Sequence, residues 1–404
     1  MFHCRICQHE TQDVINLGPM PIANGFLDKV VGNDVVFNLI VVFCPSCLMV
    51  QLKETVPPEK MFNDHYHFMS STSTSMAVHF KGNAEEIMTH VAARPDPFVV
   101  ELGCNDGIML KHIAAKGIRH LGIEPSGNVA DLAAKNNVQV LKAFFNKSTA
   151  ENIIKKHGKA DVICGSNVFC HIEDINSVFA GLATLLKDDG YVYFEDPYLK
   201  DIVQKSSFDQ IYDEHVFYYC GLSVRELARR HQLELVDMVH QDVHGGSMRY
   251  YLKKGTHPKA EARVAGMIDQ EKALQLDQMT GYKMFKDNVN QVCKDLKEIL
   301  SELKKKGNRI LGYGATSKST TLLNYAKIGP ELVDYISDNT PYKINKLTPG
   351  THIPIKSYAT FVKDNPPYTL LLAWNHKREI FEKEKSYRQS GGKFITFFPK
   401  VMIE

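Results

Sequence analysis

Two histidine segments in the middle of the chain carry side chains that could move a proton. His171 stands in Asn-Val-Phe-Cys-His171-Ile, and His215 closes the sequence Tyr212-Asp-Glu214-His215. An imidazole has an unperturbed pKa near ~6.5, so much of it is neutral and able to accept a proton at cellular pH. A lone histidine is usually structural. Because each of these follows a predicted strand, both are candidates for acid–base chemistry.

Four cysteines near the start form two pairs with the spacing of metal ligands. Cys4 and Cys7 make one Cys-x-x-Cys pair, and Cys44 and Cys47 make the other. Four thiolates in tight turns can enclose one tetrahedral Zn²⁺ and leave no open position, so the predicted zinc is structural. Free thiols are one alternative. A redox Cys-x-x-Cys is another, disfavoured because no strand-to-helix context surrounds either pair.

An acidic, Gly-rich loop follows the first strand of the central region. This strand, at 98–102, leads into Glu101-Leu-Gly103-Cys-Asn105-Asp106-Gly107. Glycines let the backbone approach a ligand at the carboxyl end of a strand. Carboxylates at the same place would repel a diphosphate but suit an amino group and a sulfonium. Charge therefore favours S-adenosylmethionine over NAD.

Two later strand ends extend this predicted cofactor site. Glu124-Pro125 ends the second strand, where a carboxylate can accept the hydroxyls of a ribose, and Asn167 ends the fourth strand over the cofactor. The alternative is that these are ordinary acidic turn residues. The predicted cofactor-binding residues are Glu101, Gly103, Asn105, Asp106, Gly107, Glu124, Pro125 and Asn167.

A second Gly-rich turn, Gly312-Tyr-Gly-Ala-Thr-Ser317-Lys318, has no acidic residue. Its amides, a hydroxyl and a cation would converge as a diphosphate requires. The alternative is a plain helix N-cap turn.

An α/β fold must position these residues. Short apolar strands alternate with helical stretches, which predicts a parallel, doubly wound sheet with strands at 98–102, 121–123, 138–140, 160–163 and 191–194. An amphipathic helix between about 280 and 305 leads into a smaller α/β unit with strands at 309–311, 333–336, 352–355 and 369–373. We predict a zinc-binding module at 1–65, a Rossmann-like core that binds S-adenosylmethionine at 66–255, and a helical bridge with a C-terminal α/β substrate-binding domain at 256–404.

Composition excludes several classes of protein. The 404 residues carry a formal net charge of only +2, so nothing suggests a nucleic-acid or membrane-surface protein. Lys29 is the only Lys or Arg between Cys7 and Cys44, which disfavours a nucleic-acid-binding zinc finger. No apolar run approaches the ~20 residues that span a bilayer. We expect a cytoplasmic monomer or small homo-oligomer that binds neither nucleic acid nor membrane.

Taken together, these motifs resemble those of the sugar C-methyltransferases. Members of this family use S-adenosylmethionine to methylate a ring carbon of nucleotide-linked deoxysugars. The resemblance covers nearly the whole chain: the two cysteine pairs, Glu101 to Gly107, Glu214-His215, Gly312 to Lys318 and Ser337-Asp-Asn339. Cys104 and Cys170 depart from the Ser or Ala more usual in the family, which affects packing more than chemistry.

The resemblance implies enolate formation beside a ketone, then methyl transfer to carbon. In the family the histidine of the Glu-His motif is the base, which is His215 here, oriented or polarised by Glu214. Tyr66, His171 and Tyr212 would position the sugar or stabilise the enolate oxygen. The substrate is expected to be a nucleotide-diphosphate-linked 4-keto-deoxysugar, with candidate contacts at Ser317, Lys318, Asn339 and Arg249.

Several alternatives remain open from sequence. Arg249, beside the Gly245-Gly246 turn, fits equally a surface arginine after a strand-connecting turn. The enzyme could be an O- or N-methyltransferase on a related sugar, or an NAD-dependent nucleotide-sugar oxidoreductase using the C-terminal Gly-x-Gly turn. A third class is a non-enzymatic zinc-dependent scaffold.

Overall fold

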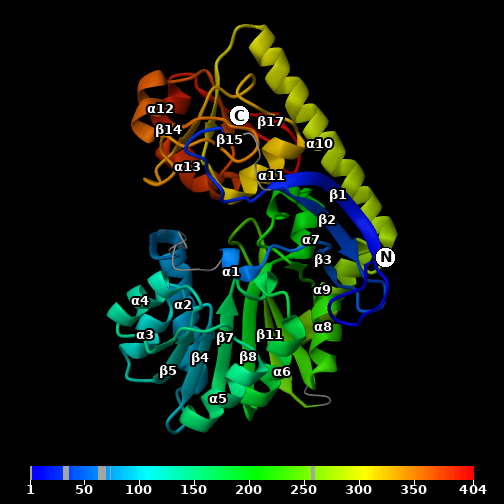
Figure 1. Cartoon of the computed structure of the whole chain (residues 1–404), viewed down its shortest axis with the longest axis vertical. Coiled ribbons are helices and arrows are strands. Elements are labelled where there is room, and N and C mark those ends of the chain that lie inside the picture. The colour runs from blue at the N-terminus through cyan, green and yellow to red at the C-terminus, as the bar shows by residue number, and fades with distance from the viewer. Residues whose placement is uncertain (1, 31–35, 62–69, 73, 256–259) are drawn as a thin grey trace.

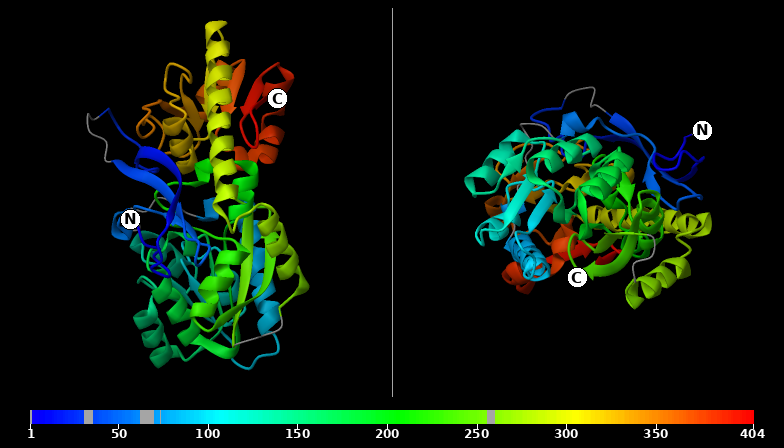
Figure 2. Two further views of the ribbon diagram at one scale, coloured as in Figure 1. Left: turned by 90° about the vertical axis from the view of Figure 1, so that its right-hand side faces the viewer. Right: turned by 90° about the horizontal axis from the view of Figure 1, so that it is seen from below.

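The computed structural model describes residues 2–30, 36–61, 70–72, 74–255 and 260–404. The molecule has a large lower part and a smaller C-terminal part above it, and the long helix α10 (Met279–Lys305) runs beside both (Figures 1 and 2). Its residues Phe285, Val289, Val292 and Leu296 are buried. The predicted amphipathic helix is therefore confirmed, and it bridges the two parts.

A seven-stranded sheet forms the centre of the lower part. Its neighbouring strands from β6 to β8 pair in parallel, whereas β11 and β10 pair antiparallel at one edge. The predicted parallel sheet is confirmed, with the correction that an antiparallel pair extends it. The order is β10 (Leu233–Gln241), β11 (Ser247–Lys254), β8 (Leu186–Pro197), β7 (Ala160–Ser166), β4 (Phe98–Leu102), β5 (Arg119–Ile123) and β6 (Val140–Leu141).

Apolar clusters cover both faces of this sheet, because alternate side chains of a strand point to opposite faces. Val99 of β4 packs into one cluster, and its neighbour Val100 packs into the other. The first cluster includes residues of α2 (Thr74–Val91), α3 (Leu110–Ala114) and α4 (Gly127–Lys135). The second includes residues of α5 (Lys147–His157), α6 (Ile175–Leu185), α7 (Leu199–Lys205) and α8 (Gly221–Arg230). α9 (Ala262–Ala273) packs against β10 and α8.

The C-terminal part holds a six-stranded sheet that is parallel except for β17. Its strand order is β14 (Ile355–Ser357), β13 (Ile336–Asp338), β12 (Ile310–Tyr313), β15 (Tyr368–Leu371), β16 (Lys393–Thr396) and β17 (Met402–Ile403). The strands predicted at 333–336 and 352–355 start only at their last residues. The helices of this part are α11 (Ser317–Tyr325), α12 (Tyr358–Asp364), α13 (Lys377–Lys383) and α14 (Lys385–Gln389).

A four-stranded antiparallel sheet organises the N-terminal residues. Its strands are β1 (Gln12–Pro21), β2 (Val36–Phe43), β3 (Val50–Leu52) and β9 (Phe217–Tyr218). The fourth strand comes from the middle of the chain and begins two residues after His215. The N-terminal sheet is therefore physically continuous with the segment that carries the predicted base.

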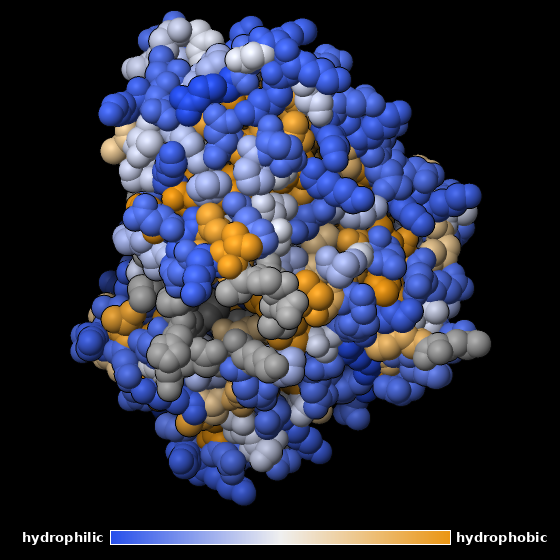
Figure 3. All heavy atoms as spheres, turned by 45° about the horizontal axis from the view of Figure 1, so that its top comes forward, coloured by the Kyte–Doolittle hydropathy of each residue, from blue (hydrophilic) through white to orange (hydrophobic). Residues whose placement is uncertain are grey.

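The surface and the helices add two further observations. On the face drawn in Figure 3, apolar side chains form several separate patches among mostly hydrophilic ones. Among the described residues, no helix combines the length and apolar character that crossing a bilayer requires. The α/β fold with a Rossmann-like core, an N-terminal cysteine module and a smaller C-terminal α/β unit is confirmed.

Candidate functional site

The four predicted zinc ligands converge at the start of the chain. Sγ of Cys4 lies 3.5 Å from Sγ of Cys47, and Sγ of Cys7 lies 3.4 Å from Sγ of Cys44. A tetrahedron with Zn–S bonds of 2.3 Å has sulfur atoms about 3.8 Å apart, so the thiols fit a four-thiolate zinc site. The backbone N–H of Ile6 and the side-chain amide of Gln51 both donate to Sγ of Cys4, which suits a thiolate.

The predicted cofactor loop turns sharply at the end of β4. Gly103, Asn105 and Gly107 all have positive φ, at 61°, 48° and 78°. A Cβ on Gly103 would lie 2.3 Å from a methyl group of Val168, and one on Gly107 would lie 3.0 Å from Val138. Both glycines are therefore required by their backbone conformation and by the side chains that pack against the loop.

Three buried carboxylates gather around this loop. Glu101, Asp106 and Glu124 are each at most 5% exposed. Burial raises the pKa of Glu101 well above its usual value, and the charges of Glu124 and Asp106 raise it further. Within the described part of the chain, Oε2 of Glu101 and Oδ1 of Asp106 have no hydrogen-bond partner. Such a site fits a cationic ligand, because a buried carboxylate without a partner is costly.

The remaining predicted cofactor residues surround these carboxylates. Glu124 accepts hydrogen bonds from the backbone N–H groups of Asn105 and Ser126, over 3.0 and 2.9 Å. Pro125 is half-buried just before α4, and Asn167, with a φ of 55°, follows β7.

A short 3₁₀ helix closes the loop from the other side. The backbone N–H of Ser70 donates to Oδ1 of Asn105, and that of Ser71 donates to Oδ2 of Asp106. Sequence reasoning did not assign these two serines, because backbone donors leave no signature in residue type. Tyr66, predicted to contact the sugar, lies outside the described residues.

His215 lies buried in a loop beyond the carboxyl end of β8. Its Nδ1 lies 2.8 Å from the carbonyl oxygen of Gln210, which can only accept, so Nδ1 carries the proton. Nε2 therefore has the lone pair and accepts a 2.9 Å hydrogen bond from the hydroxyl of Tyr212. Burial, followed by the nearby His171, lowers the pKa of His215 well below the usual value. The imidazole is neutral and its acceptor atom is fixed.

His171 and Glu214 complete the predicted reaction site. The rings of His171 and His215 meet edge to face with centroids 5.1 Å apart, and Nδ1 of His171 donates to the carbonyl of Glu214 over 2.7 Å. Burial lowers the pKa of His171 to about 4. Burial and then Asp213 raise the pKa of Glu214 to about 7, and the side-chain amide of Asn24 donates to its Oε1 over 2.7 Å. The structure thus brings together Tyr212, Glu214, His215 and His171.

Two of the predicted substrate contacts, Ser317 and Lys318, lie at the start of α11. Thr316 caps this helix through its side chain, so the N-cap geometry considered as an alternative is present. Ser317 donates from Oγ to Oδ1 of Asn24, and Lys318 donates from Nζ to the carbonyl of His244 over 3.0 Å. Burial lowers the pKa of Lys318, which Asp209 opposes. Asn339 is exposed beyond β13.

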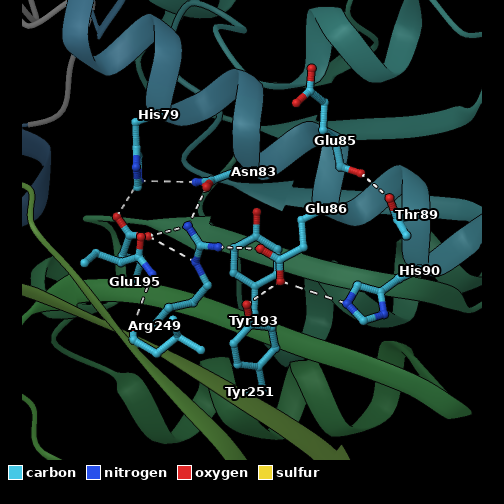
Figure 4. A network of polar contacts seen from close by, with 12 residues as sticks. His79, Asn83, Glu85, Glu86, Thr89, His90, Tyr193, Glu195, Arg249 and Tyr251 are labelled. Atoms are coloured by element: carbon cyan, nitrogen blue, oxygen red, sulfur yellow. Dashed lines mark hydrogen bonds and ion pairs between the residues drawn. The ribbon is translucent and has the colours of Figure 1, made fainter.

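Arg249 lies in a buried ionic network, drawn in Figure 4. Its guanidinium donates to Oε2 of Glu195 and pairs with Glu86 of α2, and His79 of the same helix contacts the other Glu195 oxygen at 2.7 Å. Arg249 is 5% exposed, so the alternative of a surface arginine is wrong. Its charge is already matched by carboxylates, and it anchors α2 to the sheet. The Gly245-Gly246 turn before it packs against Trp374 and Asp201.

Comparisons with known proteins agree with this arrangement. Three family models match the chain: a zinc binding domain (residues 4–62), a methyltransferase domain (82–238) and a C-methyltransferase C-terminal domain (242–399). With the clustered thiols and the acidic loop, they confirm the predicted zinc and S-adenosylmethionine cofactors.

Individual proteins show how far the similarity extends. C-methyltransferase NovU of Streptomyces niveus is 32% identical over 404 residues, which cover 99% of this chain and 96% of that protein. The ubiquinone biosynthesis O-methyltransferase of Acinetobacter baylyi is 30% identical over only 100 residues, 24% of this chain and 42% of that enzyme. A solved S-adenosylmethionine-dependent methyltransferase from Clostridium acetobutylicum aligns with a TM-score of 0.36 and 14% identity, over 44% of this chain and 92% of that one.

Proposed function

This chain belongs to the C-methyltransferase family, and from that premise we propose that it methylates a carbon atom of a nucleotide-diphosphate-linked 4-keto-deoxysugar. The observation that carries the proposal is the buried imidazole of His215. Its tautomer is fixed by Gln210, and its Nε2 lone pair is held beside the hydroxyl of Tyr212. A neutral base with a fixed acceptor atom is what proton removal from a weak carbon acid requires.

We propose that the hydroxyl of Tyr212 turns from Nε2 of His215 to the ketone oxygen of the bound sugar, and that the freed lone pair of Nε2 then removes the proton from the carbon next to the ketone. The electron pair of that C–H bond then spreads onto the ketone oxygen. The resulting enolate carbon would form its new bond to the methyl group of the bound donor, while the bond between that methyl group and sulfur would break and leave its electron pair on sulfur. Tyr212, His171 and Tyr66 are the proposed donors that position the sugar or stabilise the enolate oxygen. His215 afterwards releases its proton to solvent.

Glu214 is the proposed partner of the base. A buried imidazolium costs free energy, and an adjacent carboxylate reduces that cost. With a pKa of about 7, Glu214 is partly ionised at neutral pH. Its negative charge is therefore proposed to stabilise protonated His215, while the neutral fraction of Glu214 lets His215 lose its proton again.

The acidic loop is the proposed binding site of the methyl donor. S-adenosylmethionine, when bound, supplies an electrophilic methyl group on a positively charged sulfur. The proposed binding residues are Glu101, Gly103, Asn105, Asp106, Gly107, Glu124, Pro125 and Asn167. The buried carboxylates among them support this assignment, because they repel a diphosphate and attract a cation.

The nucleotide part of the substrate is proposed to contact Ser317, Lys318 and Asn339. Lys318 supports this proposal because it is a half-buried cation, and a phosphate can compensate such a charge. We keep 1–65, 66–255 and 256–404 as the proposed domain division. O- or N-methyl transfer would leave the imidazole pair without a carbon acid to deprotonate, and membership of a methyltransferase family disfavours an NAD-dependent oxidoreductase.

The proposal is tested with S-adenosylmethionine labelled in its methyl group. We would incubate the zinc-loaded protein with a panel of nucleotide-linked 4-keto-6-deoxysugars and locate the label by mass spectrometry and NMR. The expected product carries the methyl on a ring carbon next to the ketone. A methyl found on oxygen or nitrogen, or no product from any sugar of the panel, would contradict the proposal.

A further inference from the structure

Asn24 of the N-terminal module lies between two groups of candidate site residues. It follows β1, and its side-chain amide donates from Nδ2 to Oε1 of Glu214 over 2.7 Å. On its other side, Oδ1 accepts a 2.7 Å hydrogen bond from Oγ of Ser317. These partners are 190 and 293 positions away in sequence. One side chain thus joins the N-terminal module, the Glu-His motif and the start of α11.

The orientation of this amide follows from its partners. A carboxylate oxygen only accepts hydrogen bonds, so it takes the NH₂ group of Asn24, and the amide oxygen is left to accept from the hydroxyl of Ser317. The reverse orientation would place the amide oxygen against the carboxylate. Both bonds therefore use the Asn24 amide in a way that its isosteres Asp and Leu cannot reproduce.

The backbone around Asn24 is clamped from the same two sides. The N–H of Ala23 donates to Oδ1 of Asp213 over 3.0 Å, and its carbonyl accepts from Oγ1 of Thr320 over 3.0 Å. Ala23 is 1% exposed, whereas the side chain of Asn24 is exposed. An exposed side chain on a fixed backbone contributes little to packing, so substituting it changes mainly its two hydrogen bonds.

We infer that Asn24 is a positioning residue, which holds in place the carboxylate of Glu214, the residue that precedes the predicted base, and joins it to Ser317 on the nucleotide side. The inference rests on the proposed function, which makes Glu214 the partner of His215 and Ser317 a substrate contact. It gives the zinc module a part in the reaction. The module places an amide in the site although its metal supplies no open coordination position.

The expected sign of the pH effect follows from the groups that face Glu214. The groups near its carboxylate are Asp213, Asn24, Cys170 and Tyr342, and His171 contacts its backbone carbonyl. Asn24 lowers the pKa of Glu214, and burial and Asp213 raise it. Removing the amide donor therefore moves ionisation of Glu214 to higher pH, and an added carboxylate at position 24 moves it further.

The test compares Asn24→Gln, Asn24→Ala and Asn24→Asp in the full-length, zinc-loaded protein. We expect kcat at neutral pH to fall by about tenfold in Asn24→Ala, with the KM for S-adenosylmethionine unchanged, since a hydrogen bond to a charged group is worth about one factor of ten or more. Gln should restore part of the loss, and Asp should be the most impaired, with the acidic limb of kcat shifted to higher pH. Asn38→Ala is the matched control, because Asn38 is an exposed amide of the same module that donates to Glu54 instead.

If Asn24 only filled space, Asn24→Asp would be the least impaired variant in kcat instead of the most impaired, because Asp is closest to Asn in shape. Wild-type kcat and pH profile in Asn24→Asp would overturn the inference. If the wild-type protein methylates no sugar of the panel, the proposed function fails. The inference about Asn24 is then tested by measuring the pKa of Glu214 directly. NMR of the ¹³C-glutamate-labelled protein, with the Glu214 signal assigned through Glu214→Gln, should show a higher pKa in Asn24→Ala. An unchanged Glu214 titration would overturn it there.

Discussion

The side-chain amide of Gln51 donates a 3.1 Å hydrogen bond to Sγ of Cys4. The backbone of Gln51 also pairs with Phe217, the second residue after His215. The next residue, Leu52, donates its N–H to the carbonyl of Val216. A metal ligand and the predicted base are thus joined through one buried glutamine and a short ladder of strand hydrogen bonds.

Loss of the zinc should therefore lower turnover even though the metal takes no part in the chemistry. For Cys44→Ser we expect well under one equivalent of zinc and a loss of kcat of about tenfold or more, because β3 would no longer hold β9 in register. Metal analysis and turnover on the same preparation check this. Cys293→Ala, in α10 and outside the cluster, is the control. Full turnover in a zinc-free Cys44→Ser protein would contradict the expectation.

Replacing the predicted base should stop the reaction without affecting the cofactor site. His215→Asn removes the acceptor atom, so we expect kcat to fall by about 10²- to 10⁴-fold. Calorimetry with S-adenosylhomocysteine should give unchanged binding, because His215 lies outside the acidic loop. The exposed His90→Asn serves as the control. Near-normal turnover in His215→Asn with bound cofactor would exclude His215 as the base.

Alanine substitutions at Gly103 and Gly117 distinguish the effect of a steric clash from that of backbone strain alone. Both have positive φ, at 61° and 70°, but only a Cβ on Gly103 meets a neighbour, the side chain of Val168. We expect Gly117→Ala to lower the free energy of unfolding by about 1 kcal/mol or slightly more. Gly103→Ala should cost more and should also weaken S-adenosylhomocysteine binding, measured by calorimetry. Equal losses in the two variants would show that contact with Val168 does not constrain the loop.

Asp196 should make stability depend on pH. Burial, the largest cause, raises its pKa to about 8 in the folded protein, against 3.8 for the ordinary side chain. Between these values the folded state keeps a proton that the unfolded state has lost, so the free energy of unfolding falls as pH rises, by at most about 1.4 kcal/mol per pH unit. Asp196→Asn cannot titrate. Its stability relative to wild type should therefore increase between pH 5.5 and pH 8.5 in urea unfolding.

The control for this experiment lies in the same strand. Asp188 of β8 has a side chain that is 93% exposed, so Asp188→Asn should show the pH dependence of the wild type. An Asp196→Asn protein whose stability follows the wild type across the same pH range would show that this carboxyl ionises normally.

Motifs that depend on neighbouring residues could be predicted from the sequence. The two-residue spacing of Cys4 and Cys7 fixes a tight turn, and the glycines at 103 and 107 mark positions where a Cβ would clash. The apolar steps of α10 likewise determine which of its faces is buried. These features need only local geometry, and the structure agrees with each of them.

Features that depend on distant partners could not be predicted in the same way. Nothing near Asn24 in sequence indicates Glu214 or Ser317, and nothing near Arg249 indicates that Glu86 would neutralise it. The two residues of β9 are too few to show a strand pattern, and their pairing with β3 depends on the packing of the whole molecule. The roles of the individual site residues remain predictions, which the substitutions above would test.

β9 pairs with the N-terminal sheet although it comes from the middle of the chain, and this has a consequence for folding during synthesis. Residues of β1, β2 and β3 leave the ribosome first, but the strand that borders β3 is translated on the order of ten seconds later. Until then the edge of β3 stays open, and the thiolate-bound metal supports the pairing of β1, β2 and β3 before their border strand arrives. Metal supply during translation should therefore set the yield of folded protein, and the first fifty residues should not be exchangeable as a cassette without the segment around residue 217.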